Sequence, residues 1–265
     1  HPLIKTSFCC LDNGVHFKLS DFRAYRSVND AFAYLRRRIE SKGIFVLLAG
    51  DLGSYRTAIN TEIFRGFAIA DPIAPFVVIN NRDAPVAWAF TALHEVAHLW
   101  LGETGVSGAS ISLEIERFCN EVAGRILLPV EELNELQEIW YATLDEAVSQ
   151  VSEFARSRNI SRAMVAFSLL HSGKINQTRW QELTNQFNKE WEDSKEKKKE
   201  KKEDQKGGPN YYVVHRHRLG AAIMDLVGRS MSEGALSPTK AAKILGVKPR
   251  KVSALLNPKQ PGGRL

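Results

Sequence analysis

The chain has 265 residues, of which 44% are hydrophobic and 25% are charged, with a formal net charge of +6. This composition is ordinary for a globular protein with a sizeable core, and the positive charge permits a nucleic-acid contact without requiring one. No apolar run approaches membrane-spanning length, and three Cys, two of them adjacent, exclude a disulfide framework, so we expect a cytoplasmic protein without a membrane partner.

The first 80 residues predict short elements that lead to a later helix. We expect a strand around residues 15–19, then a helix over residues 28–41 that Ser27 caps. Arg36, Arg37 and Arg38 of this helix are expected mostly at a solvated face, because adjacent residues cannot share one side. Short apolar runs bounded by turn signals predict three strands, over residues 44–49, 66–70 and 76–79.

The next helix carries the main motif of the chain. Asp83 is expected to cap it, Pro85 falls in its first turn, and no breaker follows before Gly102. Within it stands His94-Glu95-x-x-His98, in which residues four apart lie on the same helical face. Both imidazoles can reach one cation with Glu95 near the open position, which favours a zinc hydrolase over two core histidines with an incidental Glu.

A second helix, after an expected loop over residues 102–110, offers the third ligand. Its apolar stripe is Ile115, Phe118, Cys119, Val122, Ala123 and Ile126. Glu116 lies beside this stripe, and a His, His, Glu zinc site requires such a carboxylate. Asn120, one turn further, is placed to accept the free ring N–H of a ligating His. Glu114 and Glu121 are the competing carboxylates, and both resemble solvated flank.

These segments together resemble a known family. Phe90-Thr-Ala-Leu-His-Glu-Val-Ala-His-Leu-Trp-Leu-Gly102, Ile115-Glu-Arg-Phe-Cys-Asn120 and Ala123-Gly-Arg-Ile-Leu-Leu-Pro129 are similar to the ImmA/IrrE bacterial metallo-endopeptidases. The resemblance is strong over residues 44–129. It implies a thermolysin-like, gluzincin-type core that binds zinc through His94, His98 and Glu116. It also implies that Glu95 is the catalytic base, and that the substrate is a protein, often a helix-turn-helix repressor whose cleavage releases transcription in a stress response.

Beyond residue 129 the pattern is helical. Helices are expected over residues 131–141, 144–158 and 162–171, the last capped by Ser161. Their shared core is predicted to include Leu133, Leu136, Trp140, Val148, Val151 and Phe154. A further apolar stripe stops at Trp191. The Lys- and Glu-rich segment after it is expected to be a linker, either a solvated helical extension or disordered, with a hinge at residues 207–210.

The last segment predicts a separate helical module. A helix over residues 213–229 is followed by a Ser237 cap, a turn at Gly246 and another helix. This order of elements is typical of a helix-turn-helix. Lys248, Arg250 and Lys251 open that last helix, where contacts to phosphates or bases belong. DNA binding and protein docking both remain open for this module.

The predicted fold is therefore α+β and predominantly helical, with a small sheet packed on the active-site helix pair. The predicted domains are a metallopeptidase core over residues 1–129, a helical subdomain over 130–192, a charged linker over 193–210 and a helix-turn-helix-like module over 211–265. Zn²⁺ is the expected cofactor, although Mn²⁺ or Fe²⁺ suits the same ligands.

The expected activity is a zinc-dependent endopeptidase that cleaves a helix-turn-helix repressor or a toxin–antitoxin partner. Donors for the oxyanion are sought among Tyr55, Tyr211, Tyr212, His215 and His217. The alternative is a non-catalytic, metal-stabilised regulator that binds DNA or a toxin, as an antitoxin does. An intact Glu95 argues against the alternative, because a purely structural zinc site needs no base.

Overall fold

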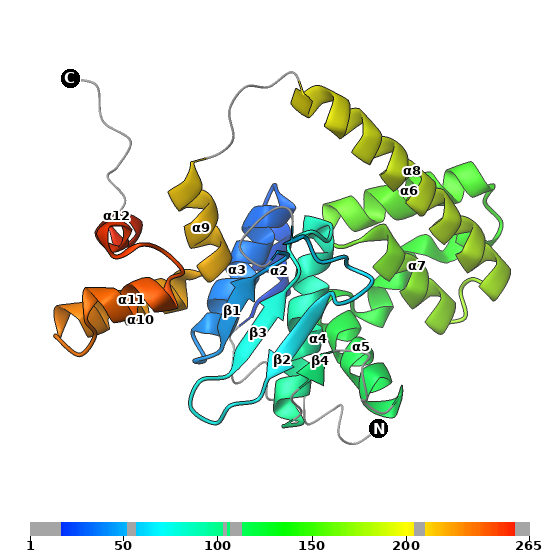
Figure 1. The fold of residues 1–265 in the computed structure, drawn as a ribbon. Helices are drawn as coiled ribbons and strands as arrows, with labels where there is room; N and C mark the ends of the chain where they lie inside the picture. The colour runs from blue at the N-terminus through cyan, green and yellow to red at the C-terminus, as the bar shows by residue number, and fades with distance from the viewer. Residues whose placement is uncertain (1–16, 52–56, 103–104, 107–112, 204–209, 258–265) are drawn as a thin grey trace.

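The computed structural model describes residues 17–51, 57–102, 105–106, 113–203 and 210–257. The fold is α+β and predominantly helical, as expected, with helices around one small sheet (Figure 1). The elements are α2 (Leu19–Ala24), α3 (Val28–Glu40), β1 (Phe45–Leu48), β2 (Gly66–Ile69), β3 (Phe76–Ile79), the 3₁₀ turn η2 (Pro85–Ala87), α4 (Trp88–Trp100), β4 (Gly105–Val106), α5 (Leu113–Leu127), the 3₁₀ segment η3 (Val130–Trp140), α6 (Leu144–Ser157), α7 (Arg162–His171), α8 (Gln177–Glu203), α9 (Tyr211–Leu219), α10 (Ala221–Ser232), α11 (Pro238–Ile244), η4 (Pro249–Lys251) and α12 (Val252–Leu256).

The sheet has four strands in the order β1-β3-β2-β4. β1 and β3 are parallel, whereas β2 runs antiparallel to both β3 and β4.

Two expectations are corrected here. The segment over residues 102–110, expected as a loop, contains β4, and Leu19 begins α2 instead of ending a strand. Residues 15 and 16 of that expected strand lie outside the described part.

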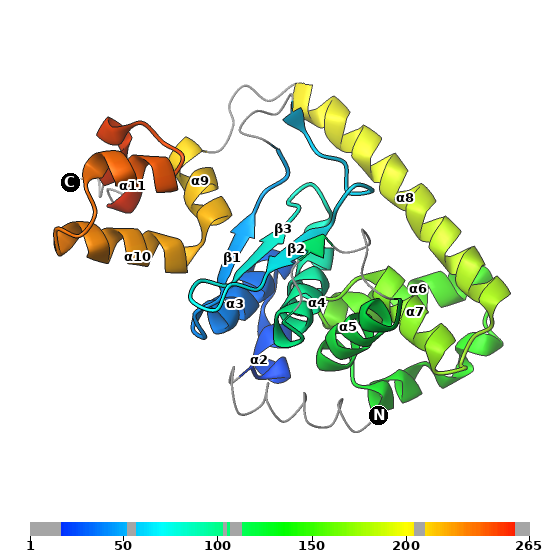
Figure 2. The ribbon, with the colours of Figure 1, turned by 60° about the horizontal axis from the view of Figure 1, so that its bottom comes forward.

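Alternate residues of β1 face two different hydrophobic clusters. Val46 and Leu48 belong to the main core with α3 and α4, whereas Phe45 and Leu47 pack against the helices of the C-terminal module. Side chains alternate between the faces of a strand, so a strand that is apolar at every position must be covered on both sides. Figure 2 shows this arrangement, with α3 and α4 on one face of the sheet and α9 and α10 beyond β1.

Arg36 joins the C-terminal module to the core, and its expected solvated position is wrong. The side chain is buried, with only 6% of the residue exposed. Its guanidinium donates to the backbone carbonyls of Val46, His217 and Arg218 and pairs with Glu40 at 3.2 Å. Buried charge is tolerated when it is paired and hydrogen-bonded, so the arginine is held inside by carbonyl groups of α9.

Gly220 divides the expected helix over residues 213–229 into α9 and α10. Its φ of 84° and ψ of 167° lie in a region that is essentially restricted to glycine. A Cβ atom built there collides with Arg36 and Glu40. Glu40 also accepts hydrogen bonds from the backbone N–H groups of Ala221 and Ala222 at the start of α10. The break in the helix therefore accommodates the buried ion pair.

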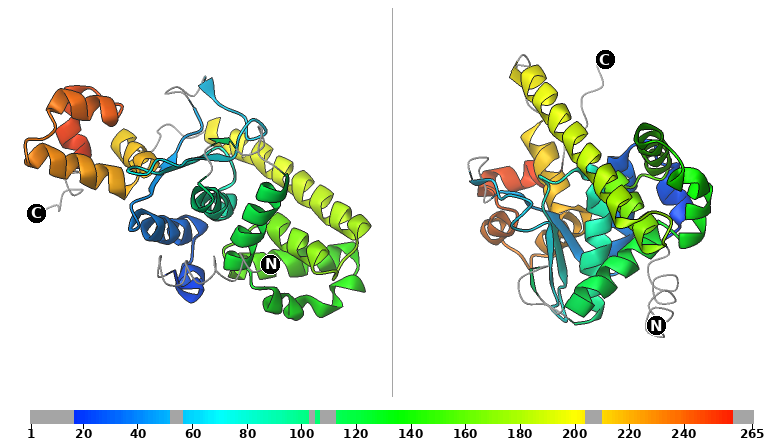
Figure 3. Two further views of the ribbon diagram at one scale, coloured as in Figure 1. Left: turned by 90° about the horizontal axis from the view of Figure 1, so that it is seen from below. Right: turned by 90° about the vertical axis from the view of Figure 1, so that its right-hand side faces the viewer.

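The helical subdomain packs α6, α7 and α8 around Leu169, Val151 and Leu183, all fully buried. The predicted cap at Ser161 is confirmed, since its hydroxyl accepts from the Met164 N–H. Thr143, which the sequence analysis did not single out, forms a capping box with Glu146. The prediction that Trp140 lies in the core is wrong, since the residue is 48% exposed. α8 runs as one helix past residue 192, away from the other helices (Figures 1 and 3).

The domain boundaries of the sequence analysis stay a prediction. Residues 204–209, where most of the hinge was expected, lie outside the described part of the chain. A search of the described helices finds none both long and apolar enough to cross a membrane.

Substituting Gly220 tests the junction between core and module. We expect Gly220→Ala to lower the free energy of unfolding by at least about 1–3 kcal/mol, because the backbone strain adds to the displacement of Arg36 and Glu40. The measurement is equilibrium denaturation. The control is Gly228→Ala within α10, where an added Cβ meets nothing within 4 Å. That control should be neutral or more stable by about 0.5–1 kcal/mol, and equal behaviour of both variants would contradict the argument.

Candidate metal centre

The helix α4 is the most deeply enclosed element near the site. Its residues from Thr91 to His98 are all buried, because β2 and β3 cover one side and α5 covers another. The start of the helix differs from the prediction. Asp83 Oδ1 accepts from the Ala84 N–H at 2.8 Å, and one 3₁₀ turn from Pro85 to Ala87 precedes the α-helix proper. Gly102, with φ of 72°, follows the end of the helix.

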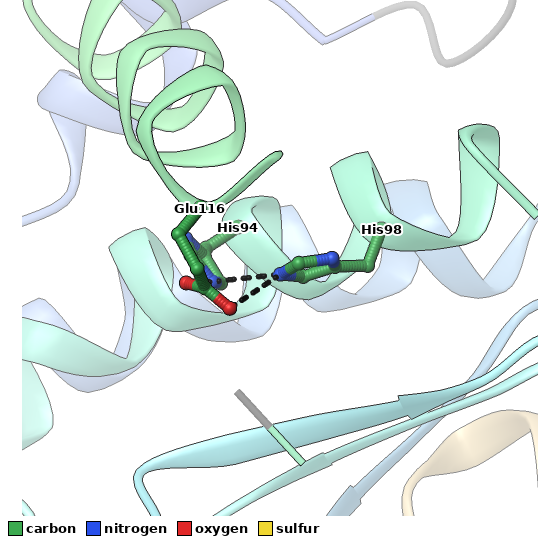
Figure 4. Close-up of side chains that lie close together, drawn as sticks. All are labelled: His94, His98 and Glu116. Atoms are coloured by element: carbon green, nitrogen blue, oxygen red, sulfur yellow. Dashed lines mark hydrogen bonds and ion pairs between the residues drawn. The ribbon is translucent and has the colours of Figure 1, made fainter. Parts of the chain in front are cut away.

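The structure brings His94, His98 and Glu116 together (Figure 4). The two Nε2 atoms are 3.1 Å apart, and the Glu116 oxygens lie 3.3 Å from His94 Nε2 and 3.6 Å from His98 Nε2. Two ligands of one tetrahedral zinc, each about 2.0–2.1 Å from the metal, are roughly 3.3–3.4 Å apart. Two imidazole nitrogens and a carboxylate at this separation fit one divalent ion.

The local electrostatics keep His94 in the form that binds metals. Burial, with a smaller contribution from His98, lowers the pKa of His94 to about 4, and a hydrogen bond with the Asn120 side chain opposes this shift. His94 is therefore neutral at physiological pH, and only neutral imidazole offers a nitrogen lone pair to a cation.

The helix α5 positions both Glu116 and Asn120. They stand one turn apart on the side that faces α4, and buried Cys119 and Val122 hold the helix against the core. The Asn120 side chain hydrogen-bonds His94, and both residues line the same cavity. A side-chain partner of this kind fixes the orientation of a metal-binding imidazole.

The competing carboxylates lie elsewhere. Glu114 is exposed in the first turn of α5, and exposed Glu121 pairs with Arg125 at 2.6 Å. Among the residues that the structure describes, His94, His98 and Glu116 are the group of three metal-ligand types found within 4.8 Å of one another.

Glu95 is 1% exposed and lies against strand β2, at the edge of the metal cluster. A Cβ atom at Gly66 would stand 2.8 Å from Glu95 Oε1 and 2.6 Å from the Thr91 methyl group. Since real Cβ atoms are not found so close, the glycine leaves the space that the Glu95 carboxylate occupies. The sequence analysis used Gly66 only as part of a strand, and its role depends on a contact that only the fold creates.

Two adjoining cavities open beside the cluster. The first, of about 450 Å³, is lined by His94, Glu95 and Glu116 and by parts of β2 and α7. The second, of about 410 Å³, lies between α5, η3 and α7. Both are lined by Phe90, Asn120, Met164 and Phe167, so the two cavities adjoin at these residues and are together called the cleft below. The cleft extends well beyond the space that a metal and a water molecule need.

The expected oxyanion donors do not reach this cleft. Tyr211, Tyr212, His215 and His217 lie on α9, which packs against β1 beyond the sheet, and none of them lines either cavity. His215 Nε2 is instead 2.6 Å from the Leu245 carbonyl oxygen.

The remaining expected donor, Tyr55, lies outside the described residues. The polar hydrogen-bond donors that do line the metal cavity include Arg65, Asn120 and Ser161. The sequence analysis assigned an oxyanion role to none of these, since their approach to the cluster depends on how β2, α5 and α7 pack.

The basic residues proposed for nucleic acid are remote from the metal. Lys248 and Arg250 are exposed, and the Lys251 ammonium lies 5.1 Å from the centre of the Tyr211 ring. The structure thus separates the two groups of candidate residues across the sheet (Figure 1).

A helix with His-Glu-x-x-His, a glutamate from the next helix and a small sheet define the metallopeptidase type of site. Comparison with known families agrees: residues 46–170 match the peptidase family Peptidase_M78, described as the IrrE N-terminal-like domain. This part of the chain is similar to that family, and it contains every residue of the cluster and the cleft named above. Neither a curated protein nor a solved structure matches the chain significantly.

Replacing Glu116 tests the third ligand. We expect Glu116→Ala to lose metal affinity, because only two imidazoles remain to hold the ion. Metal content after dialysis and the rise of the melting temperature on adding zinc are the measurements. Glu114→Ala and Glu121→Ala are matched controls on the same helix. If Glu116→Ala kept full zinc occupancy while one of the controls lost zinc, the third ligand would be the glutamate replaced in that control.

Proposed function

We propose that the protein is a zinc-dependent endopeptidase that cleaves a protein substrate. The observation that carries the proposal is a buried carboxylate, Glu95, next to His94 of the His, His, Glu cluster and lining the same cavity of about 450 Å³. A structural zinc site usually closes with four protein ligands, whereas the described residues bring three together here. The family match supports peptidase activity.

In the proposed mechanism, His94, His98 and Glu116 hold the zinc ion. When bound there, the ion would supply Lewis acidity toward water and a carbonyl group. Glu95 takes a proton from the attacking water and passes it to the leaving amine. Asn120 keeps the His94 ring in its orientation through their hydrogen bond. Arg65 and Ser161, at the wall of the same cavity, are the groups available to hold the substrate carbonyl.

The shape of the cleft favours a polypeptide over a small molecule. The two cavities together let a chain extend from the cluster along α5 and α7. Apolar Phe90, Met164 and Phe167 at their junction can hold an apolar side chain next to the cleaved bond. The resemblance described above suggests the substrate itself: a helix-turn-helix repressor or a partner in a toxin–antitoxin pair. The cytoplasm, inferred from the cysteines, is the proposed site of action.

The second candidate function is a non-catalytic, metal-stabilised regulator. The observation in its favour is the basic helical module, since such modules often serve binding alone. In a regulator of this kind the Glu95 carboxylate would take part in no reaction. The two candidate functions therefore predict different effects of replacing Glu95.

Glu95→Gln separates these two functions. The amide is nearly the same shape but cannot take a proton, so cleavage should fall by about 10²–10⁴-fold while zinc content stays at the parent level. Each form is co-expressed with a helix-turn-helix repressor or toxin encoded beside it, and the partner's mass is followed by mass spectrometry. The control is Glu114→Gln, on exposed surface, which should cleave as the parent does.

Cleavage by the parent and by Glu114→Gln, with an intact partner in Glu95→Gln, supports the peptidase. If parent and Glu95→Gln bind or neutralise the partner equally and no new terminus is detected, the regulator is the correct function.

A further inference from the structure

The positive charge of the chain is concentrated in its C-terminal module. Residues 210–257 contain eight Lys and Arg but only two Asp and Glu, a surplus of six that equals the net charge of the whole chain, +6. From Gly234 to the last residue the sequence contains no acidic residue at all. A surplus confined to one module indicates a partner of opposite charge for that module, because solubility alone would not require such segregation.

Two of the eight cations serve the fold. Arg216 donates to the backbone carbonyl of Leu255 at 2.7 Å, and Arg218 pairs with Asp51 at 2.8 Å. Lys240, Lys243, Lys248 and Arg250 are exposed, and within the described part of the chain they make no ion pair with a carboxylate. These side chains therefore add charge to the surface without supporting the packing of the module.

The free cations lie on a helix-turn-helix arrangement, in the order expected from the sequence. Ser237 caps α11 by accepting from the Lys240 N–H, and Gly246, with φ of 64°, makes the turn. The turn leads through η4 into α12. Helices α10, α11 and α12 enclose a small core of their own. Its most buried members are Val227, Ala241, Leu245, Val252 and Leu255. The buried alanines and leucines of this core let α11 and α12 approach closely. This packing fixes the position of α12 relative to α11.

Lys248, Arg250 and Lys251 stand where the turn meets the second helix. In helix-turn-helix proteins the start of the second helix enters the major groove, and its neighbours contact phosphates. Lys240 and Lys243 on the first helix add two charges of the same sign nearby in sequence. Duplex RNA fits this arrangement less well, since its major groove is too narrow for a helix.

The module also lies away from the metal centre. Figures 1 and 3 show α10, α11 and α12 at one end of the molecule and α5 and α7 at the other, with the sheet between them. Arg36 and Asp51 of the core hold α9 in place through His217 and Arg218. A large ligand on the basic module would therefore leave the cleft open.

We infer that the segment from Ser237 to Asn257 binds double-stranded DNA through Lys240, Lys243, Lys248, Arg250 and Lys251. This inference goes beyond the proposed function and does not depend on it. The bound DNA would place the metal centre beside proteins that occupy the same duplex.

The test is fluorescence anisotropy of a labelled DNA duplex of mixed sequence, titrated with the full chain at several salt concentrations. Each phosphate contact contributes about 0.9 to the slope of log affinity against log salt. The triple variant Lys248→Glu, Arg250→Glu, Lys251→Glu should lose at least tenfold in affinity, and its slope should be shallower by about three. Metal content and melting temperature confirm that the variant is folded.

The control variant carries the same change of charge on the core. Arg26→Glu, Arg37→Glu and Lys42→Glu alter exposed cations of the N-terminal segment and should leave DNA binding nearly unchanged. An equal loss in both triple variants would show attraction by net charge alone and would overturn the inference. So would failure of the folded parent to bind the duplex at low salt, or tighter binding to duplex RNA or to an acidic protein such as polyglutamate.

Discussion

The burial of helix α4 is the constraint from which the metal centre follows. Eight successive residues of this helix are enclosed, and among them are two imidazoles and a carboxylate. Polar groups removed from water must be compensated, and a divalent ion shared with Glu116 would compensate several of them together. Two neighbouring elements contribute to the same site. Helix α5 supplies Glu116 and Asn120, and β2 has a glycine where the Glu95 carboxylate needs space. A surface helix with the same motif would impose none of these requirements.

Periodicity along each helix, together with the family resemblance, predicted the cluster. The spacing of four places His94 and His98 on one face, and Glu116 and Asn120 follow in the same way from the stripe of α5. The three strands that precede the motif were also predicted within one residue at each end, because short apolar runs between turn signals have few alternatives. These are features that depend on contacts between residues near one another in the sequence.

Several of the failures involve partners distant in sequence. Arg36 stands four residues after Phe32, on the inward face, yet its charge suggested solvent; the carbonyls that accept its hydrogen bonds belong to His217 and Arg218. Gly220 interrupts the expected helix because a side chain at that position would collide with Arg36 and Glu40, which are distant in sequence. Strand β4 is two residues long and exists because β2 offers an open edge. The oxyanion donors were sought among tyrosines and histidines by chemistry alone, and α9 carries the four described candidates against β1, where none of them lines either cavity.

The ion pair of Arg36 and Glu40 has a consequence for how such proteins can diversify. Helix α3 contributes both charged groups, whereas the groups that satisfy them come from the carbonyls of α9 and the first N–H groups of α10. A recombination event that exchanged the tail for another sequence would remove the backbone partners that α9 and α10 give to these two charges, and would leave only their own pairing and the Val46 carbonyl. The tail can therefore be inherited as a cassette only together with position 36, position 40 and the glycine between its first two helices. Covariation of these three positions among relatives would be the trace of that joint inheritance.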